Sequence, residues 1–199
     1  MFEKRSVKVM VRASLLGSIS VILKQLNITL PIFPSFLDLD ISDVPAIVGA
    51  ITTGPLTGLL IVLIKNLIDP ILFGTTTAGI GNLGNFVMGS ALVVPIGIVF
   101  QKRRDSLGYL LGGVLGILCT VIAAVFMNYF VLLPLFDRFF IPMETIIAIA
   151  HAVNSNVTSK FTLIIFAIIP FNLLKATLVV AIGFLIYRAL RPVMERLRV

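Results

Sequence analysis

Residues 40–69 read DISDVPAIVGAITTGPLTGLLIVLIKNLID, a long apolar stretch that Gly54-Pro55 interrupts in the middle. A glycine followed by a proline is typical of a turn and then a helix start, because glycine accepts unusual backbone angles and proline suits the first helical position. We therefore expect two short helices, over roughly 40–53 and 55–69, joined by a tight hairpin. The split decides how the rest of the chain is threaded, because it adds one helix to the count.

The composition of the chain indicates a protein that lives in a lipid bilayer. Its 199 residues are 58% hydrophobic and only 13% charged, with a mean hydropathy of +1.11, far outside the range of soluble domains. Crossing the hydrocarbon core takes about 20 apolar residues, so the apolar runs leave room for roughly six helices and for no soluble domain. We predict an all-α integral membrane protein, a single domain over 1–199, with spans at roughly 8–27, 40–53, 55–69, 81–100, 107–133 and 159–189. The first apolar stretch runs to about Leu26 without a small-residue cleavage site, so we interpret it as a retained helix.

The distribution of charge sets the expected orientation. Six spans with the N-terminus inside place eleven of the 16 bases on the cytoplasmic face: Lys4, Arg5, Lys8, Arg12, Lys102, Arg103, Arg104, Arg188, Arg191, Arg196 and Arg198. Six of the nine acids fall on the other face or at the adjoining helix ends: Asp38, Asp40, Asp43, Asp69, Asp137 and Glu144. This asymmetry follows the positive-inside rule, and five spans would violate it. Both termini are therefore expected in the cytoplasm of a multi-pass protein of the bacterial plasma membrane.

The same charge pattern argues against a nucleic-acid partner. The net charge of +7 comes from short basic clusters separated by membrane-length segments, so no continuous basic stripe is formed. The single Cys119 lies in an apolar run, which excludes a disulfide framework and a cysteine metal site.

Three loops of this arrangement face outward, over 28–42, about 70–80 and about 134–158. The first, ITLPIFPSFLDLDIS, holds two prolines, two aromatics and two carboxylates but no base. Irregular backbone needs water or protein partners at membrane depth, so its concentration on one face suggests a site that opens to that face.

Several polar side chains fall within the spans or at their outer ends: Lys65, Asn66, Asn82, Asn85, Asn128, Asn172 and Lys175. Each costs several kcal/mol in lipid unless it is paired or faces a cavity. Asn172 and Lys175 lie on one helical face about one turn apart, just after Pro170, which frees backbone carbonyls and bends a helix. We favour a cavity role for Lys175, whereas any one asparagine can equally serve as interhelical glue. Lys65 can reach the outer interface by snorkelling, and His151 is expected to be a solvated loop residue.

Two further patterns are open to a structural explanation. Gly79–Gly84 satisfies G-x-G-x-x-G but opens a membrane helix instead of following a strand, so a dinucleotide site is rejected. The chain has no G-x-x-x-x-G-K-[ST] motif and does not hydrolyse ATP by that chemistry.

Ala13 and Gly17 form a small-xxx-small pair, and Ser14 and Ser18 form a second. Such pairs let another helix pack closely, either within this chain or on a partner.

Four segments, FLDLDISDVPAIVGAITTGPLTGLLIVLIKN, GIGNLGNF, MNYFVLLP and PFNLLK, occur in this order. Together they resemble the riboflavin-specific substrate-binding component (S component, RibU type) of energy-coupling factor (ECF) transporters, over nearly the whole chain. The resemblance implies a six-helix membrane protein that captures riboflavin from outside. It also implies a transmembrane coupling subunit (EcfT type) and two cytoplasmic ATPase subunits (EcfA type), which supply the energy. Riboflavin is then the transported ligand, and no cofactor is expected.

The resemblance also implies site residues. Carried over by motif, the riboflavin contacts are Leu37, Asp38, Asp40, Asn128, Asn172 and Lys175. Asn85 is added from its expected position, and the resemblance assigns Ala13 and Gly17 to docking with the coupling subunit. Amide side chains donate and accept at once, which suits the uracil-like edge of the flavin. Five aromatic side chains near the same level are candidates to sandwich its ring: Phe33, Phe36, Phe86, Tyr129 and Phe171.

Other functions remain as alternatives. One is an S component for another vitamin. A second is a lipid enzyme, in which Asp38, Asp40 and Asp43 hold a metal ion, although no His or Glu cluster and no nucleophile with a base completes such a site. A third is a self-sufficient secondary transporter, which lacks a clear inverted repeat and a proton relay here. We therefore expect no enzyme and no metal, with riboflavin and membrane lipid as the small-molecule partners.

Overall fold

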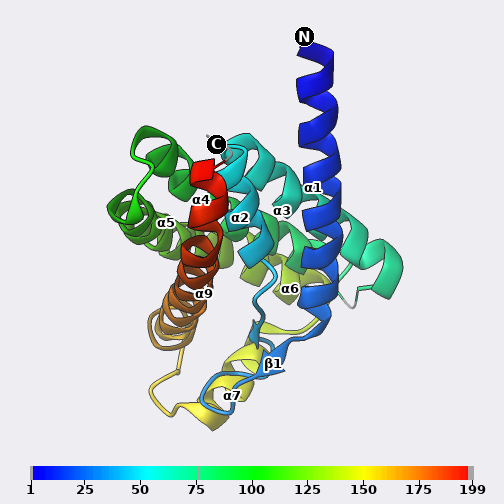
Figure 1. Cartoon of the computed structure of the whole chain (residues 1–199). Coiled ribbons are helices and arrows are strands. Elements are labelled where there is room, and N and C mark those ends of the chain that lie inside the picture. The colour runs from blue at the N-terminus through cyan, green and yellow to red at the C-terminus, as the bar shows by residue number, and fades with distance from the viewer. Residues whose placement is uncertain (1, 76, 197–199) are drawn as a thin grey trace.

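The computed structural model describes residues 2–75 and 77–196 and is almost entirely helical (Figure 1). Arg198 lies outside the described residues, and the side chains of Lys4, Arg5, Lys8 and Arg196 are not described. The helices are α1 (Phe2–Gln25), α2 (Val44–Thr52), α3 (Pro55–Phe73), α4 (Ile80–Lys102), α5 (Ser106–Phe126), α6 (Leu133–Phe139), α7 (Met143–Val153), α8 (Lys160–Leu163) and α9 (Ile169–Arg196). Two π-helical segments interrupt them, η1 (Met127–Leu132) and η2 (Ile164–Ile168), and two short strands, β1 (Ile28–Thr29) and β2 (Asp38–Leu39), form a hairpin.

The two ends of the molecule differ in character. The start of α1 and the end of α9 lie at one end, whereas the β1–β2 hairpin and α7 lie at the opposite end (Figure 1). The strands pair antiparallel, with Ile28 opposite Leu39 and Thr29 opposite Asp38. The irregular backbone that the sequence assigns to 28–42 thus lies at the end of the molecule opposite the start of α1 and the end of α9.

The turn at Gly54-Pro55 is confirmed. Gly54 has a φ of +131° and Pro55 begins α3, so the glycine adopts a backbone conformation that side chains disfavour and the proline fills the first helical turn. The helix before the turn is shorter than predicted. Its nine residues rise about 13 Å, against about 30 Å of hydrocarbon, and residues 40–43 belong to the connection from the hairpin.

Four helices among the described residues are long and apolar enough to cross a membrane: 55–73, 80–102, 106–139 and 160–192. The third and fourth are continuous through η1 and η2, and the fourth extends a few residues past the predicted span. The outer loop predicted at about 134–158 is wrong in part. It contains all of α6 except Leu133 and the whole of α7, so His151 lies on a helix. The connection predicted at about 70–80 narrows to residues 74–79, because α3 continues through Pro70 to Phe73.

Two apolar clusters form the interior. The bundle cluster lies among α1 to α5 and α9 and includes Ile47, Val93, Tyr109 and Tyr187. The π-segment cluster lies around η1, η2 and α7 and includes Leu133, Ala150, Leu163 and Ile168. The basic connection after α4 is held at its end by Asp105, whose carboxylate accepts hydrogen bonds from Gly108 N–H (2.7 Å) and from Arg103 (2.9 Å). These bonds hold the pKa of Asp105 below its usual range.

Candidate functional site

The candidate site forms where the hairpin meets α9. Lys175 Nζ lies 2.6 Å from Asp40 Oδ2, and both side chains are largely buried, with 15% and 8% exposed. The same ammonium donates a longer bond of 3.4 Å to the backbone oxygen of Asp38. Two residues that the resemblance assigns to the ligand site thus bind each other directly, across 135 positions of sequence.

Asp38 takes a different position from Asp40. Its carboxylate is exposed and accepts a hydrogen bond of 2.7 Å from Thr29 Oγ1, its partner across the hairpin. Only its backbone oxygen faces Lys175. Leu37, one residue earlier, is partly buried and packs against the π-segment cluster. The hairpin therefore contributes one backbone oxygen near Lys175, and the connection that follows it contributes one buried carboxylate.

An aromatic contact fastens the same hairpin to α9. Phe33 is 8% exposed, and its ring meets that of Phe171 edge to face, with centroids 5.3 Å apart and planes inclined by 79°. Phe171 precedes Asn172 in the chain, so the contact lies next to the candidate amide. Phe36, in contrast, is 41% exposed, and Phe86 packs against the bundle cluster.

A second charged pair continues from Asp40 into the protein. Lys65 Nζ donates to Asp43 Oδ1 at 2.5 Å and to Ser42 Oγ at 2.9 Å. Ser42 in turn donates its hydroxyl and its backbone N–H to Asp40 Oδ1. Lys65 is only 2% exposed, so it does not snorkel to an interface. Gly89 of α4 leaves room for this group, because a Cβ there would lie 2.9 Å from Asp43 Oδ1.

The two candidate asparagines lie in or just after π-helical segments. Asn128, in η1, donates from Nδ2 to Ala124 O at 2.8 Å, and Asn172, four residues after η2, donates to Ile168 O at 2.9 Å. Both side chains are buried, 9% and 6% exposed. Among the described residues no donor binds either amide oxygen. π-Helical turns leave the regular hydrogen-bond ladder and are common at functional sites, which agrees with a binding role for these two amides.

Sequence reasoning missed one contact near the same segments. Lys160 Nζ lies 4.3 Å from the centroid of the Tyr129 ring, a cation–π contact that joins the start of α8 to η1. The two residues are 31 positions apart, and only the fold brings them together. Asn85 lies on α4, partly exposed, next to Gly84, whose missing Cβ makes room for Leu132 of η1. No hydrogen bond or ion pair among the described residues joins Asn85 to the other candidates.

Ala13 and Gly17 are packed within the chain, which is one of the two roles that the sequence left open for this small pair. Ala13 is 2% exposed and belongs to the bundle cluster. A Cβ on Gly17 would lie 2.7 Å from Ile64 Cγ2 of α3. The pair therefore allows α1 to pack closely on α3 within the chain. The second small pair, Ser14 and Ser18, lies on the exposed side of α1.

A separate polar cluster joins three helices. Asp69 of α3 accepts hydrogen bonds from Lys24 (2.6 Å), Gln25 (2.7 Å) and Asn82 (2.8 Å), which come from α1 and α4. Asn82 thus acts as interhelical glue, one of the two roles that the sequence left open. Asn66 also binds within its own helix, to Val62 O at 2.9 Å.

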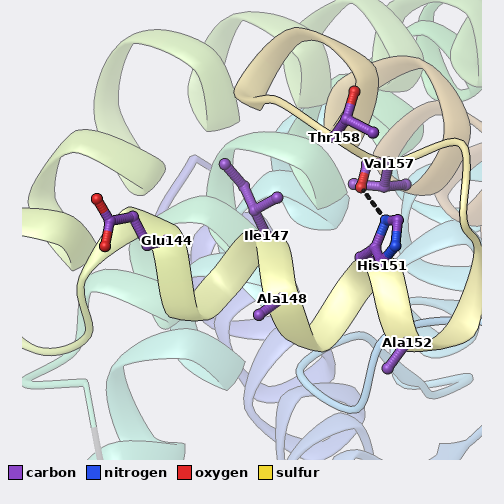
Figure 2. A pocket seen from close by; sticks show the side chains of 7 residues that line it. All are labelled: Glu144, Ile147, Ala148, His151, Ala152, Val157 and Thr158. Carbon is purple, nitrogen blue, oxygen red and sulfur yellow. Dashed lines mark hydrogen bonds between the residues drawn. The ribbon is translucent and has the colours of Figure 1, made fainter.

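The surface of α7 carries a hollow of about 530 Å³ whose lining includes Glu144, Ile147, His151 and Val157 (Figure 2). His151 Nδ1 hydrogen-bonds Val157 O at 2.9 Å, drawn as a dashed line. None of the candidate ligand residues lines this hollow. His151 is exposed, as expected, although it stands on a helix and has a backbone partner.

Two of the three carboxylates that the sequence offered as metal ligands are engaged in ion pairs. Asp40 and Asp43 are each bound by a lysine ammonium. Over residues 2–75 and 77–196, no three His, Cys, Asp or Glu side chains come together in a group that could hold a metal ion.

Comparisons with known proteins agree on one family. The model of the ECF transporter substrate-specific component matches residues 8–187. Riboflavin transporter FmnP of Bacillus subtilis (strain 168) is 30% identical over 193 residues, which cover 96% of each chain. Riboflavin transporter RibU of Staphylococcus aureus (strain TCH60) is 28% identical over 190 residues, which cover 96% of this chain and 94% of the relative.

A solved structure described as "Structure and mechanism of the S component of a bacterial ECF transporter" matches with a TM-score of 0.74 and 26% identity. The match covers 95% of this chain and 98% of that one. The family consists of transporter components and not of enzymes. The chain belongs to the family of substrate-specific components of ECF transporters.

Proposed function

We propose that this protein captures riboflavin from the outside as the substrate-binding subunit of an ECF importer. The observation that supports this most strongly is the contact between Lys175 and Asp40, which joins the hairpin to the PFNLLK helix. Both segments belong to the set that resembles riboflavin-specific components. The relatives that match over nearly their full length are themselves named riboflavin transporters.

The chemistry of the proposed site suits a flavin. Asn128 and Asn172 each use Nδ2 for a backbone carbonyl, and neither amide oxygen has a donor among the described residues. Each oxygen can therefore accept a hydrogen bond from the uracil-like edge of the ring. The Lys175 ammonium has three N–H donors, so while it binds Asp40 it can also donate to a ring carbonyl or a ribityl hydroxyl. Leu37 supplies an apolar contact, and Asp38, Asp40 and Asn85 complete the proposed set of riboflavin contacts. No cofactor or covalent chemistry enters this function.

Titration of riboflavin into the purified protein tests the proposal. Flavin fluorescence should be quenched, and Asn172→Ala should weaken binding about five- to hundredfold, the cost of about 1–3 kcal/mol for one unsatisfied buried partner. Asn82→Ala is the matched control, because Asn82 binds Asp69 and lies outside the proposed site. Absence of quenching at micromolar riboflavin, with folded protein confirmed, would instead favour an S component for another vitamin.

We propose that the chain forms one six-helix membrane domain over 1–199, multi-pass in the bacterial plasma membrane with both termini in the cytoplasm. The start of α1 and the end of α9 lie at the same end of the molecule (Figure 1), and the bases gather on the segments expected there. Cysteine labelling in intact cells, after replacement of Cys119, tests this orientation. Arg103→Cys should resist an external reagent, whereas Ser35→Cys in the hairpin should react.

We propose a transmembrane coupling subunit of the EcfT type and two ATPase subunits of the EcfA type as partners. Ala13 and Gly17 support α1 from within, so the surface left for a partner is the opposite side of α1, with Ser14, Ser18 and the exposed Leu15. Ser18→Leu should abolish uptake and spare riboflavin binding. Gly17→Leu should lose both, because its side chain would collide with Ile64. Normal uptake by Ser18→Leu would exclude this side of α1.

A further inference from the structure

Lys65 is a buried charge that the proposed site does not yet use. It lies in the middle of α3 and is 2% exposed, and a lysine in such a position costs several kcal/mol unless partners compensate its charge. The partners are Asp43 and Ser42. Asp43 precedes α2, but its side chain makes no capping bond to that helix. The carboxylate is therefore used for Lys65.

The direction of the hydrogen bonds between Lys65 and Asp40 is fixed by chemistry. An ammonium only donates, and a carboxylate only accepts. Ser42, 0% exposed, stands between them, so its hydroxyl must accept from Lys65 and donate its single proton to Asp40. Hydrogen bonds in such a series polarise and strengthen one another. Asp40 then uses its other oxygen, Oδ2, to accept from Lys175.

Four charged groups are joined by this series of hydrogen bonds, and their charges alternate in sign: Lys175, Asp40, Lys65 and Asp43. They sum to zero, which is the arrangement that a low-dielectric interior tolerates best. The positive charge of Lys65 therefore offsets part of the electrostatic attraction of Asp40 and Asp43 for the Lys175 ammonium. The Ser42 bond also holds the Asp40 carboxylate in the orientation that Lys175 meets.

We propose that Lys65 is a positioning residue of the binding site, which acts through Ser42 and Asp40 to set the place and availability of the Lys175 ammonium. The inference rests on the proposed function, because it gives Lys175 the role of a ligand contact. Lys65 itself does not touch the ligand. Its effect on riboflavin affinity is transmitted by hydrogen bonds alone, from α3 to α9.

The series of hydrogen bonds from Lys65 through Ser42 and Asp40 to Lys175 is called the relay below. Ser42→Ala tests the relay without changing any charge. The variant removes the hydroxyl between Lys65 and Asp40, and we expect riboflavin to bind about five- to twentyfold more weakly. The decisive measurement repeats the change in a Lys175→Met background. Asp40 loses its ion-pair partner there, so size-exclusion chromatography must first confirm that this background is folded. There Ser42→Ala should alter the remaining affinity less than about twofold, since the group on which it acts is gone. An equal loss in both backgrounds would overturn the proposal, because Ser42 would then act on the fold or on Asp40 as a direct ligand contact, and not through Lys175.

The charged end of the relay needs a variant that still folds. Lys65→Met alone leaves Asp43 buried without a partner, so it is combined with Asp43→Asn, which keeps the net charge unchanged. We expect this double variant to remain folded and to lose affinity by about the same factor as Ser42→Ala. Adding Ser42→Ala to it should produce no further loss, since both changes interrupt one series of bonds. Unchanged affinity in the folded double variant would also overturn the proposal.

Lys24→Met combined with Asp69→Asn is the matched control. It removes another lysine–aspartate pair, 2.6 Å apart, that also anchors α3 but has no bond to Lys175. Its affinity should stay within about twofold of the wild type. The tests separate two failures. A wild-type protein that does not bind riboflavin contradicts the proposed function, whereas normal binding by wild type and relay variants alike contradicts only the role of Lys65.

Discussion

The bundle cluster and the π-segment cluster bury similar apolar residues in different ways. In the bundle cluster, glycines bring backbones close together: a Cβ on Gly116 would lie 2.5 Å from Leu92 O. Tyr109 and Tyr187 stack with centroids 5.4 Å apart and planes inclined by 8°. Around the π segments the backbone leaves regular α-helical geometry, and buried asparagines bind nearby carbonyls. One region is a tightly packed frame, and the other holds the two asparagines of the proposed binding site.

The difference teaches how one small membrane protein combines stability with binding. Close packing without polar groups leaves little for a solute to recognise, because a hydrogen-bonding ligand needs donors and acceptors that are not fully used by the protein. We propose that the region around η1 and η2, against which Leu37 packs, supplies such groups. Changes in the bundle cluster should therefore affect folding, and changes near the π segments should affect affinity.

Gly116→Leu should have the largest effect. Backbone of α4 lies against Gly116, and a backbone oxygen cannot move aside as a flexible side chain can. The strain of more than about 4 kcal/mol should prevent folding, seen as loss of monodisperse protein on size-exclusion chromatography. Gly81→Ala is the control, since its Cβ would meet only Thr77 Oγ1 at 3.3 Å. A folded Gly116→Leu protein would show that the bundle cluster is not a tight frame.

Lys175→Ala should come next and should change affinity without unfolding the protein. The change removes the proposed donor to the flavin, and riboflavin should bind about five- to hundredfold more weakly, a cost of about 1–3 kcal/mol. Fluorescence titration measures the affinity, and size-exclusion chromatography confirms the fold. Unchanged affinity would mean that Lys175 serves only to pair with Asp40, and the contrast between the two regions would lose its main support.

Tyr109→Phe should produce a smaller effect, which lowers stability and leaves riboflavin affinity unchanged. The tyrosine hydroxyl donates to Val180 O at 2.9 Å in the bundle cluster, and its loss should cost about 1 kcal/mol of stability, lowering the melting temperature by about 2–4 °C. Riboflavin affinity should not change. A variant with normal melting but weaker binding would reverse the assignment of stability to one region and affinity to the other.

Lys160→Ala should have the smallest effect and would sharpen the boundary of the site. The cation–π contact with Tyr129 is worth about 0.5–1 kcal/mol at a partly exposed position, so affinity should fall about two- to fivefold if the tyrosine ring faces the flavin. Calorimetry is suited to so small a change. A loss larger than that of Lys175→Ala would move the centre of the site from α9 toward η1.

The sequence predicted the frame of this protein well because its signals are local. Apolar runs of membrane length, the Gly54-Pro55 turn and the irregular stretch at 28–42 each depend on neighbouring residues. The structure confirms the turn and the irregular stretch, and among the described residues it has helices long and apolar enough to cross a membrane at four of the six predicted spans. The length of α2 and the existence of α7 escaped prediction. Short apolar segments have no hydropathy signal that separates a membrane span from a buried or surface helix.

The sequence by itself determined the membrane class, the family resemblance and the residue types available for binding a flavin. Only the tertiary structure decided which of these residues meet. It paired Asp40 with Lys175, buried Lys65 against Asp43 instead of letting it snorkel, and turned Ala13 and Gly17 inward onto α3. The physical reason is that helix rotation and ion pairing depend on contacts between segments far apart in the chain. A pattern such as small-xxx-small specifies close packing but not the helix that provides it.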